Sequence, residues 1–381
     1  MKKLFWFGLI GLLLFEIANV YFITPMPGSQ QMNSIDLAYF LYSWRWAFRI
    51  LFGLMIVIGL FRAKWHRRRK WLLILPLLVL VAVIFMANFK MAADAMFKQP
   101  KQFLMVAADQ NKVDSNRLVI GVSNNGEAKA YPIQFLGYHH HVQDTIGGKP
   151  ILVTYCTVCR TGRVFEPIVN GRKETFRLVG MDHFNAMLED DATGSWWRQV
   201  TGEAIAGKLK GQHLPEVFSS QTSLAEWLRL NPKSLVMQAD PGFVDSYGKT
   251  TKFEDGTSRA SLTGTDSLSW RDKSWVIGVK AGEERKAYDW NLLKKVHIIH
   301  DKINDTPLII VASGDNRSFF VYKRPDDNVT FSFANDVLSY NNKHFGLDGR
   351  GIDTSLTLMP LPAYQEFWHS WRTFNPGTKK Y

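Results

Sequence analysis

Three long apolar runs in the first ninety residues constrain this chain more than any other feature. The runs cover residues 4–23, 38–61 and 71–89, and between them they carry few charged side chains. A helix needs about 20 apolar residues to cross the hydrocarbon core of a bilayer. Because each run reaches about that length, the sequence predicts three N-terminal transmembrane α-helices.

Basic residues orient these predicted helices. Lys2 and Lys3 precede the first run, and six more basic residues lie between the second and third runs: Arg62, Lys64, Arg67, Arg68, Arg69 and Lys70. Loops rich in Lys and Arg stay in the cytoplasm. A cleaved signal peptide is the alternative for the first run, but its apolar stretch is too long and no small-residue cleavage site follows. The expected location is therefore the cytoplasmic (inner) membrane, multi-pass, with everything after Phe89 outside the cytoplasm, in the periplasm of a Gram-negative cell.

The net charge of +12 does not point to nucleic acid. Its densest block is the loop just described, and no nucleic-acid recognition motif accompanies it. The lipid bilayer is the partner that this charge distribution predicts, no nucleic-acid partner is expected, and protein partners cannot be named from it.

An internal repeat organises the remaining chain. Residues 119–122 (Val-Ile-Gly-Val) recur as 276–279, and residues 129–131 (Lys-Ala-Tyr) recur as 286–288, at a constant offset of 157. Such periodicity is typical of two copies of one supersecondary unit. The expected layout is a transmembrane region 1–95, a tether 96–117, a first repeat 118–214, a connecting segment 215–274 and a second, degenerate repeat 275–375.

Both copies are expected to be rich in β-strands. Asn124-Asn125-Gly126, Gly147-Gly148 and Asn170-Gly171 separate short apolar runs, and such pairs are strong hairpin signals. The predicted fold is thus membrane-anchored, with three transmembrane helices and a β-dominated domain, all-β or α+β, outside the cytoplasm.

The two cysteines of the chain, Cys156 and Cys159, form a Cys-x-x-Cys pair. Two functional interpretations are open for it, a redox dithiol and a metal knuckle. Redox pairs of the thioredoxin type lie at a helix N-terminus, which stabilises the thiolate. Here Arg160-Thr161-Gly162 and a predicted strand follow, so the pattern favours metal.

Hairpin geometry adds His139 to this candidate site. If Gly147-Gly148 is the turn, His139 faces Cys156 across the hairpin, with Cβ atoms about 5 Å apart. A shift of one residue in register would undo this arrangement. The second repeat has other residues at the equivalents of His139, Cys156 and Cys159: Val296, Ser313 and Asn316. The scaffold therefore does not require these three residues, whereas the histidine present in both copies (His140, His297) is expected to be structural.

A fourth ligand is sought in the segment after the next hairpin. His183 is the first candidate, and Met181 and Met187 are the others. Two sulfurs and one imidazole nitrogen suit Cu(I), or Zn²⁺ with a fourth ligand. The predicted metal ligands are Cys156, Cys159, His139 and His183, the predicted cofactor is a copper or zinc ion, and no catalytic residue can be named.

The chain also resembles a known family in residues that include Lys129-Ala130-Tyr131-Pro132, His139, Asp144, Gly147-Gly148, Tyr155-Cys156, Cys159, Gly180, Thr193-Gly194-Ser195, Trp197, Gln199 and 201–207. They are similar to the pattern of domain-of-unknown-function family 3179 (DUF3179) over roughly 118–375. The resemblance implies a bacterial or archaeal extracytoplasmic protein, without an assigned activity. The chain departs from the family pattern at His140, Thr157 and Arg160, where Glu, Pro and Gly are usual, and Arg160 weakens the interpretation as a zinc knuckle.

Three hypotheses of function follow. The first is a membrane-tethered, extracytoplasmic metal-binding protein that handles copper or zinc or performs metal-centred redox chemistry. The second is a thiol–disulfide oxidoreductase that uses Cys156 and Cys159. The third is a non-catalytic module that binds a partner in the cell envelope. The sequence shows no motif of the familiar hydrolases or nucleotide enzymes, and whether the protein is an enzyme stays open.

Overall fold

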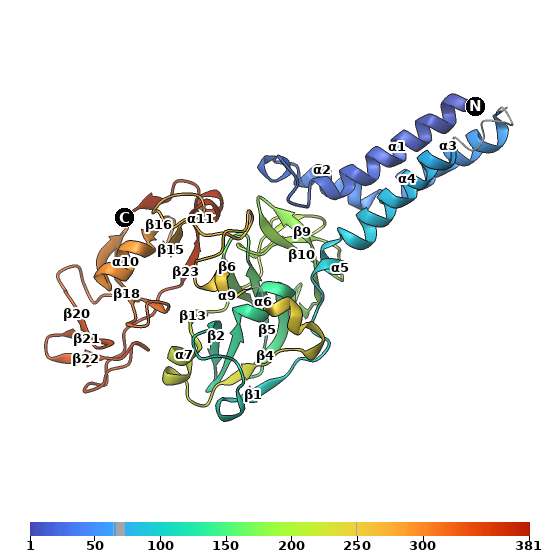
Figure 1. Ribbon diagram of the computed structural model, residues 1–381. Coiled ribbons are helices and arrows are strands. Elements are labelled where there is room, and N and C mark those ends of the chain that lie inside the picture. The colour runs from blue at the N-terminus through green and yellow to red at the C-terminus, as the bar shows by residue number, and fades with distance from the viewer. Residues whose placement is uncertain (64, 66–72, 249) are drawn as a thin grey trace. The chain divides into compact units, whose positions relative to one another are not determined.

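The computed structural model of the protein describes residues 1–63, 65, 73–248 and 250–381 (Figure 1). Most of the predicted basic loop, residues 64 and 67–70, and the first two residues of the third apolar run lie outside this range. The described chain forms two compact units. Unit 1 comprises residues 1–98, 174–198 and 203–213, and unit 2 comprises residues 99–173, 199–202 and 214–381.

Helices dominate the N-terminal part of unit 1. They are α1 (Lys2–Tyr21), the 3₁₀ turn η1 (Ser29–Gln31), α2 (Ile35–Ser43), α3 (Arg45–Arg62), α4 (Ile74–Phe85), the π-helical turn η3 (Met86–Lys90) and α5 (Ala93–Met96). Helix α1 packs against both α3 and α4 (Figure 1). Large apolar side chains on the outer faces of these helices are exposed, among them Phe7, Leu14, Leu51, Phe61 and Leu75.

The prediction of three transmembrane helices is wrong for the part of the chain that the structure describes. There, α1 is the one helix that is long and apolar enough to cross a membrane by itself. The second apolar run is broken at Trp44 into α2 and α3, which are bent by 61° and could count together as one span. The third run forms a shorter apolar helix, Ile74–Lys90. Run length alone predicted neither the break nor the shorter helix.

Polar side chains meet inside the helical part of unit 1. Glu16 of α1 is fully buried and accepts hydrogen bonds from the guanidinium of Arg49 in α3, at 2.6 and 2.9 Å. Asn88 of η3 bonds to both of these side chains, at 3.0 and 2.6 Å. The contacting faces of these helices therefore carry charge, while their outer faces are apolar.

A four-stranded sheet completes unit 1. Its order is β12-β11-β10-β9, with β9 (Phe176–Asp182), β10 (Asn185–Asp190), β11 (Trp196–Arg198) and β12 (Ala204–Ala206). Trp196 is fully buried and packs edge-on against Tyr39 of α2, with ring centroids 5.1 Å apart. Ile23 and Met187 belong to the same apolar cluster. Helix α2 thus belongs to a mixed core with this sheet.

Within unit 2 the two sequence repeats have the same order of elements, if the first is extended by residues 220–237 and the second by residues 379–380. Strands β9 to β12 of the first repeat belong to unit 1. In the first repeat these are β2 (Leu118–Asn124), β3 (Glu127–Pro132), α6 (Ile133–His139), β4 (His141–Ile146), β5 (Lys149–Cys156), β6 (Thr161–Phe165), β13 (Ser220–Ser223), α7 (Leu224–Leu230) and β14 (Leu235–Met237). In the second they are β15 (Trp275–Ala281), β16 (Glu284–Asp289), α10 (Trp290–Val296), β17 (Ile298–Ile303), β18 (Thr306–Ala312), β19 (Phe319–Lys323), β23 (Ala363–Phe367), α11 (Trp368–Phe374) and β24 (Lys379–Lys380).

Each repeat builds one larger sheet and one three-stranded sheet. The larger sheets have the orders β1-β14-β3-β2-β13 and β23-β15-β16-β24, and the smaller ones are β4-β5-β6 and β17-β18-β19. The other elements of unit 2 are β1 (Met105–Ala107), η4 (Ala108–Gln110), β7 (Ile168–Val169), β8 (Arg172–Lys173), η5 (Pro241–Phe243), α8 (Val244–Tyr247), α9 (Thr251–Glu254), β20 (Ser332–Ala334), β21 (Val337–Tyr340) and β22 (Lys343–Phe345). Strands β13 and β14 lie in the segment 215–274, so this segment contributes to the first sheet rather than only joining the two repeats.

Equivalent close contacts hold the larger sheets to their helices. The ring of Trp227 in α7 covers Gly121 of β2, and a Cβ atom added at Gly121 would lie 2.2 Å from it. In the second repeat the ring of Trp371 covers Gly278 in the same way, at 2.1 Å. Only glycine leaves room for such an approach, because any larger side chain would overlap the indole ring.

The hairpin turns lie where the sequence indicated them. Asn125 and Gly126 both have positive φ, 48° and 81°, and connect β2 to β3. Gly147 and Gly148 connect β4 to β5 with φ of 52° and 80°. Two consecutive residues with positive φ are the mark of the tight turn whose twist suits a two-residue hairpin. The turn signals therefore predicted these hairpins correctly, and the β-rich part of the fold prediction is confirmed.

Candidate functional site

The Cys-x-x-Cys pair lies in the tight turn between β5 and β6. Cys156 ends β5 and faces Thr161 of β6, and residues 157–160 form the turn. Cys156 is 1% exposed and Cys159 is fully buried. Arg160 has φ of 55°, and this left-handed residue reverses the chain into β6. The turn therefore brings both sulfur-bearing side chains into the interior of unit 2.

The second repeat and the residues just before it surround this turn. The backbone N–H of Phe367 in β23 donates to the carbonyl of Cys159 at 3.0 Å. The carbonyl of Val158 accepts from Lys273 Nζ and from His369 Nε2, both at 3.2 Å. Because a carbonyl only accepts, His369 carries its proton on Nε2. The cysteine turn of one repeat is thus packed against β23 and α11 of the other.

Burial dominates the electrostatics of the thiols. It raises the pKa of the Cys159 thiol well above its usual range, and the neighbouring Cys156 thiol raises it further, while Ser370 lowers it by hydrogen bonding. Burial also lowers the pKa of Lys273, whereas the adjacent Cys159 and Cys156 act in the opposite direction. Lys273 is thus close enough to interact electrostatically with both thiols. Burial lowers the pKa of His369 to about 4, so its ring is neutral at pH 7.

A buried ion pair lies beside the thiols. The guanidinium of Arg163 in β6 bonds to the carboxylate of Glu366 in β23, and their side chains are 1% and 0% exposed. The other carboxylate oxygen of Glu366 accepts from Ser370 Oγ at 2.8 Å. This ion pair therefore links the two repeats directly behind the cysteine turn.

His139 does not face Cys156. The predicted hairpin register is correct, since His141 pairs with Thr154 and Asp144 pairs with Ile151. However, β4 begins only at His141, because His139 ends helix α6 and the next residue is left-handed. The Nε2 atom of His139 lies 2.6 Å from the Tyr247 hydroxyl, and residue 139 lies outside the β4–β5 ladder, which begins at the pair His141–Thr154. Periodicity could not show that a helix takes up the residues before the strand.

The histidine shared by both repeats has the same role in each. His140 and His297 have φ of 62° and 59°, and their Nδ1 atoms lie 2.9 and 3.2 Å from the carbonyls of Tyr155 and Ala312. Each ends a short helix and turns the chain into the next strand. The structural role that the sequence predicted for this histidine matches this geometry.

The remaining candidate ligands lie in unit 1. His183 follows β9, has φ of 49°, and its Nδ1 lies 2.6 Å from Asp182 Oδ1. Met187 is fully buried in the core of unit 1, and Met181 is partly buried in β9. Because the cysteines belong to unit 2, a site that His183 shares with them stays a prediction.

The geometry does not support a complete metal site. Within residues 1–63, 65, 73–248 and 250–381, no group of three or more His, Cys, Asp or Glu side chains is placed so that it could hold a metal ion. Cys156 and Cys159 supply two sulfurs. The copper or zinc site that the sequence predicted therefore has no support among the described residues and stays a prediction.

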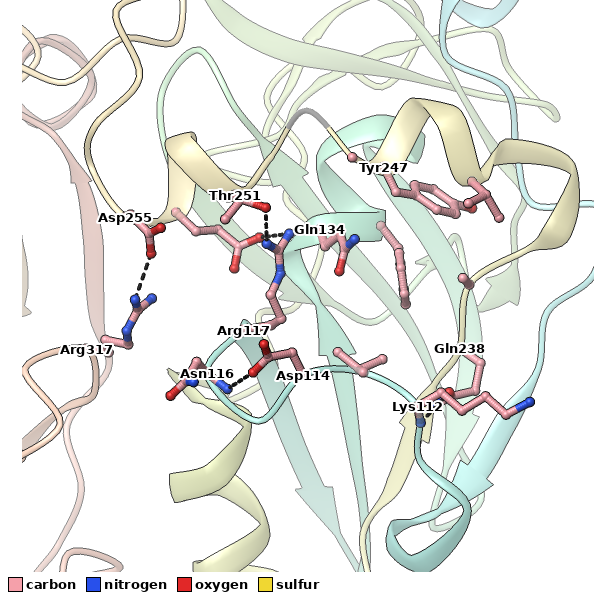
Figure 2. A pocket seen from close by; sticks show the side chains of 16 residues that line it. Lys112, Asp114, Asn116, Arg117, Gln134, Gln238, Tyr247, Thr251, Asp255 and Arg317 are labelled. Atoms are coloured by element: carbon pink, nitrogen blue, oxygen red, sulfur yellow. Dashed lines mark hydrogen bonds and ion pairs between the residues drawn. The ribbon is translucent and has the colours of Figure 1, made fainter.

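A polar cleft is lined by residues from the segments 112–135 and 238–255 and by Arg317 (Figure 2). It has a volume of about 640 Å³. Arg117 lies at its centre, forms an ion pair with Glu254 at 2.8 Å, and donates to the hydroxyls of Thr250 and Thr251. Burial raises the pKa of Glu254 to about 7, against the opposing effect of Arg117.

Sequence reasoning missed Lys273, Glu366, His369 and Ser370, as well as this cleft. None of these residues lies at a recognisable spacing from the cysteines, since 114 or more positions separate them along the chain. The one available signal was the repeat itself, which indicated that two copies pack together without indicating which residues would meet.

Comparison with known proteins identifies a family but no characterised relative. The model of the family described as "Protein of unknown function (DUF3179)" matches residues 98–378. No curated protein and no solved structure matches the chain.

Proposed function

This chain belongs to the DUF3179 family, and from the geometry of its own residues we propose that it is a membrane-anchored thiol–disulfide exchange protein in which Cys156 and Cys159 are the reacting pair. The observation that carries the proposal is that two buried thiols share a turn in which the Val158 carbonyl accepts a hydrogen bond from the basic side chain of Lys273 at 3.2 Å. A dithiol in this setting can form an internal disulfide, and Lys273 favours the thiolate that such exchange requires.

In the reducing direction, Cys156 and Cys159 reduce the disulfide of a substrate protein and are themselves oxidised to a disulfide. One thiol, as its thiolate, attacks a sulfur of a protein disulfide, forms a mixed disulfide and releases the other substrate sulfur as a thiolate. The second thiolate of the pair then attacks the mixed disulfide, which closes the Cys156–Cys159 bond and releases the second substrate sulfur. Two electrons pass to the substrate, and the two protons lost by the pair end on the substrate thiolates.

Burial favours this direction of the exchange. Strong oxidants of this class have a reduced form that is stabilised by a low thiol pKa. Here burial raises the pKa of the Cys159 thiol, so the reduced form lacks that stabilisation. The pair is then a better reductant than oxidant.

The exposed apolar faces of unit 1 support a membrane anchor. Side chains such as Phe7, Leu51 and Leu75 are at least half exposed on α1, α3 and α4, whereas Glu16 is buried between the helices. Apolar side chains on the outer faces and a charged side chain between the helices are the reverse of the pattern in a water-soluble bundle. This arrangement suits a lipid environment. By the positive-inside rule, Lys2 and Lys3 favour a cytoplasmic N-terminus. With α1 as the single span, the proposal locates unit 2 outside the cytoplasm, in the periplasm if the source is Gram-negative.

Metal binding is the competing proposal. Two neighbouring thiolates are soft ligands that suit Cu(I) or Zn²⁺. Its support is limited to Cys156 and Cys159, because no third ligand joins them among the described residues. A non-catalytic module for an envelope partner is the other alternative, and it predicts that both cysteines can be replaced without loss of partner capture.

A redox titration of the full-length protein in detergent tests the proposal. The protein is equilibrated in dithiothreitol buffers of graded potential, and remaining thiols are trapped with a mass tag. We expect one two-electron transition at or below the potential of thioredoxin, about −270 mV. Reduction of oxidised glutathione should disappear in Cys159→Ser and slow by about tenfold in Lys273→Met, a loss of about 1.4 kcal/mol of thiolate stabilisation. The control Lys302→Met, at an exposed ion pair, should react like the wild type.

Elemental analysis separates this proposal from metal binding. A stoichiometric copper or zinc content that is lost in Cys156→Ser/Cys159→Ser, together with thiols that never form an internal disulfide, would reject thiol exchange in favour of metal binding. Equal metal content in both proteins would reject the metal site.

A further inference from the structure

The Arg117 cleft combines paired charges with polar side chains that the proposed thiol exchange does not use. Its lining residues include Lys112, Arg117, Gln134, Tyr247, Glu254 and Arg317. It continues into a second cavity of about 230 Å³, which shares Glu254, Asp255 and Arg317 with it. In Figure 2 the Asp255–Arg317 pair lies at one end of the cleft and Tyr247 at the other. The cleft is therefore elongated, with a charged end and an aromatic end.

The charges along the cleft are balanced. Arg117 pairs with Glu254 at 2.8 Å and Arg317 pairs with Asp255 at 2.7 Å. The exposed Lys112 and Asp114 add one charge of each sign to the lining. Such a lining does not suit a ligand of one sign, such as a phosphate or a nucleic acid, which needs an excess of cations. Amide donors and acceptors, together with an aromatic end, suit a peptide chain with its alternating N–H and C=O groups.

The wall of the cleft backs onto the cysteine turn. A methyl group at Gly137 would lie 3.1 Å from Thr157 Cγ2, inside the Cys-x-x-Cys turn, and 3.6 Å from Thr250 Cγ2. Thr250 in turn accepts a hydrogen bond from Arg117 at 2.8 Å. The cysteine turn and the cleft are therefore separated by a single layer of residues.

Arg160 makes a second connection between the two sites. It directly follows Cys159, donates to the carbonyl of Phe253 at 3.0 Å, and stacks on Trp275 at 3.4 Å from the ring centroid. Phe253 immediately precedes the cleft residue Glu254. Arg160 thus links the cysteine turn directly to the segment that lines the cleft.

We propose that the Arg117 cleft binds an extended polypeptide segment, the one that carries the disulfide on which Cys156 and Cys159 act. This inference rests on the proposed thiol–disulfide exchange for the identity of the substrate. Binding itself uses only the cleft residues, so it can be measured without any exchange of sulfur.

The probe is reduced and carboxamidomethylated α-lactalbumin, an unfolded chain with neither thiols nor disulfides. Its binding to the full-length protein is measured by fluorescence anisotropy, in a detergent without a sugar head group. We expect saturable binding that weakens about tenfold in Gln134→Ala/Arg317→Ala, since each change removes hydrogen-bonding groups from the cleft. The control Lys302→Ala removes an exposed ion pair elsewhere in unit 2 and should bind like the wild type.

The outcomes separate the two proposals. A wild-type protein that cycles between dithiol and disulfide but does not bind the unfolded chain would overturn the cleft assignment alone. Binding without any redox cycling would support the cleft and overturn thiol exchange. Unchanged affinity in the double variant, or displacement of the probe by maltotetraose, would also reject a peptide site. If the double variant unfolds at a lower temperature than the wild type, Lys112→Ala, at an exposed residue of the lining, is used in its place. This variant should also bind the unfolded chain more weakly than the wild type.

Discussion

Replacing Glu366 by glutamine removes the charged partner of Arg163 while the shape of the side chain is kept. The two side chains are 0% and 1% exposed, so the guanidinium stays in a water-excluded site without its counter-ion. Breaking a buried ion pair from one side costs about 3–5 kcal/mol, because the remaining charge is uncompensated. The pair joins β6 to β23 beside the cysteine turn, so this cost lowers the free energy of opening the thiol site.

The two cysteines report that opening directly. Both are buried, and they are the only cysteines in the chain, so a thiol reagent reacts only when the site opens. Where reclosing is faster than labelling, the rate follows the population of the open state. A loss of about 3–5 kcal/mol then accelerates labelling about 100- to 4,000-fold, since each 1.4 kcal/mol is a factor of ten. The assay labels the reduced full-length protein in detergent. The labelling rate must increase in proportion to the reagent concentration, as it does when reclosing is faster than labelling.

The matched control is Glu284→Gln. Glu284 forms an ion pair with Lys379 at 3.0 Å, but these side chains are 38% and 64% exposed. Exposed pairs contribute little, so labelling should change by no more than about fivefold. The reasoning is refuted if Glu366→Gln labels within tenfold of the wild type, or no faster than Glu284→Gln.

Two further predictions concern stability. Gly278→Ala should lower the free energy of unfolding by about 1–3 kcal/mol, because its Cβ would lie 2.1 Å from the Trp371 ring. The control in thermal unfolding is Gly248→Ala, whose added Cβ meets no atom within 4 Å. Equal melting temperatures for the two variants would contradict the expectation. Acid should destabilise the protein between pH 6.5 and 4, because burial lowers the pKa of both His140 and His369 to about 4 and the unfolded chain binds protons that the folded chain does not. The contribution of each histidine is present above pH 6.5, is lost as pH falls to 4, and amounts to at most about 3 kcal/mol. Chemical unfolding at pH 7 and pH 4.5 checks this, and His369→Gln should lose less stability over that interval than the wild type; an equal loss would show that His369 is not buried in its neutral form.

Local features of the fold followed from the sequence. Each predicted hairpin turn depends on two adjacent residues whose positive φ is available at low cost to Gly and Asn, so the turns at 125–126 and 147–148 could be located from residue type alone. The register of the β4–β5 hairpin followed from its turn, because a two-residue loop determines which residues face each other. The repeat was visible for a similar reason, since both copies retain the residues that their turns and core positions require.

The candidate site was predicted only in part. The Cys-x-x-Cys pair is a local pattern, and its position at the end of a strand was anticipated. His139 was misplaced because its seven-residue helix is too short to show the helical period clearly. Glu366 and His369 could not be assigned at all, since they reach the cysteines only when β23 and α11 pack against the turn, and Lys273 precedes β15, 114 residues after Cys159.

The helical part of unit 1 was likewise predicted only in part. Apolar run length indicated where helices would form, but it did not indicate the break at Trp44, after which α3 begins, or the contact of α2 with the sheet that contains Trp196. A run of apolar residues is compatible with a straight span or with a bent pair, and the packing partners decide between them.

The amino-acid sequence by itself determined the features that act over a few residues: apolar helices, tight turns, the facing residues of a hairpin and the two neighbouring cysteines. Tertiary structure alone decided which side chains surround those cysteines, because burial and charge pairing depend on residues more than a hundred positions away. Both the raised pKa of Cys159 and the Arg163–Glu366 pair arise from that packing, and neither can be read from a local pattern.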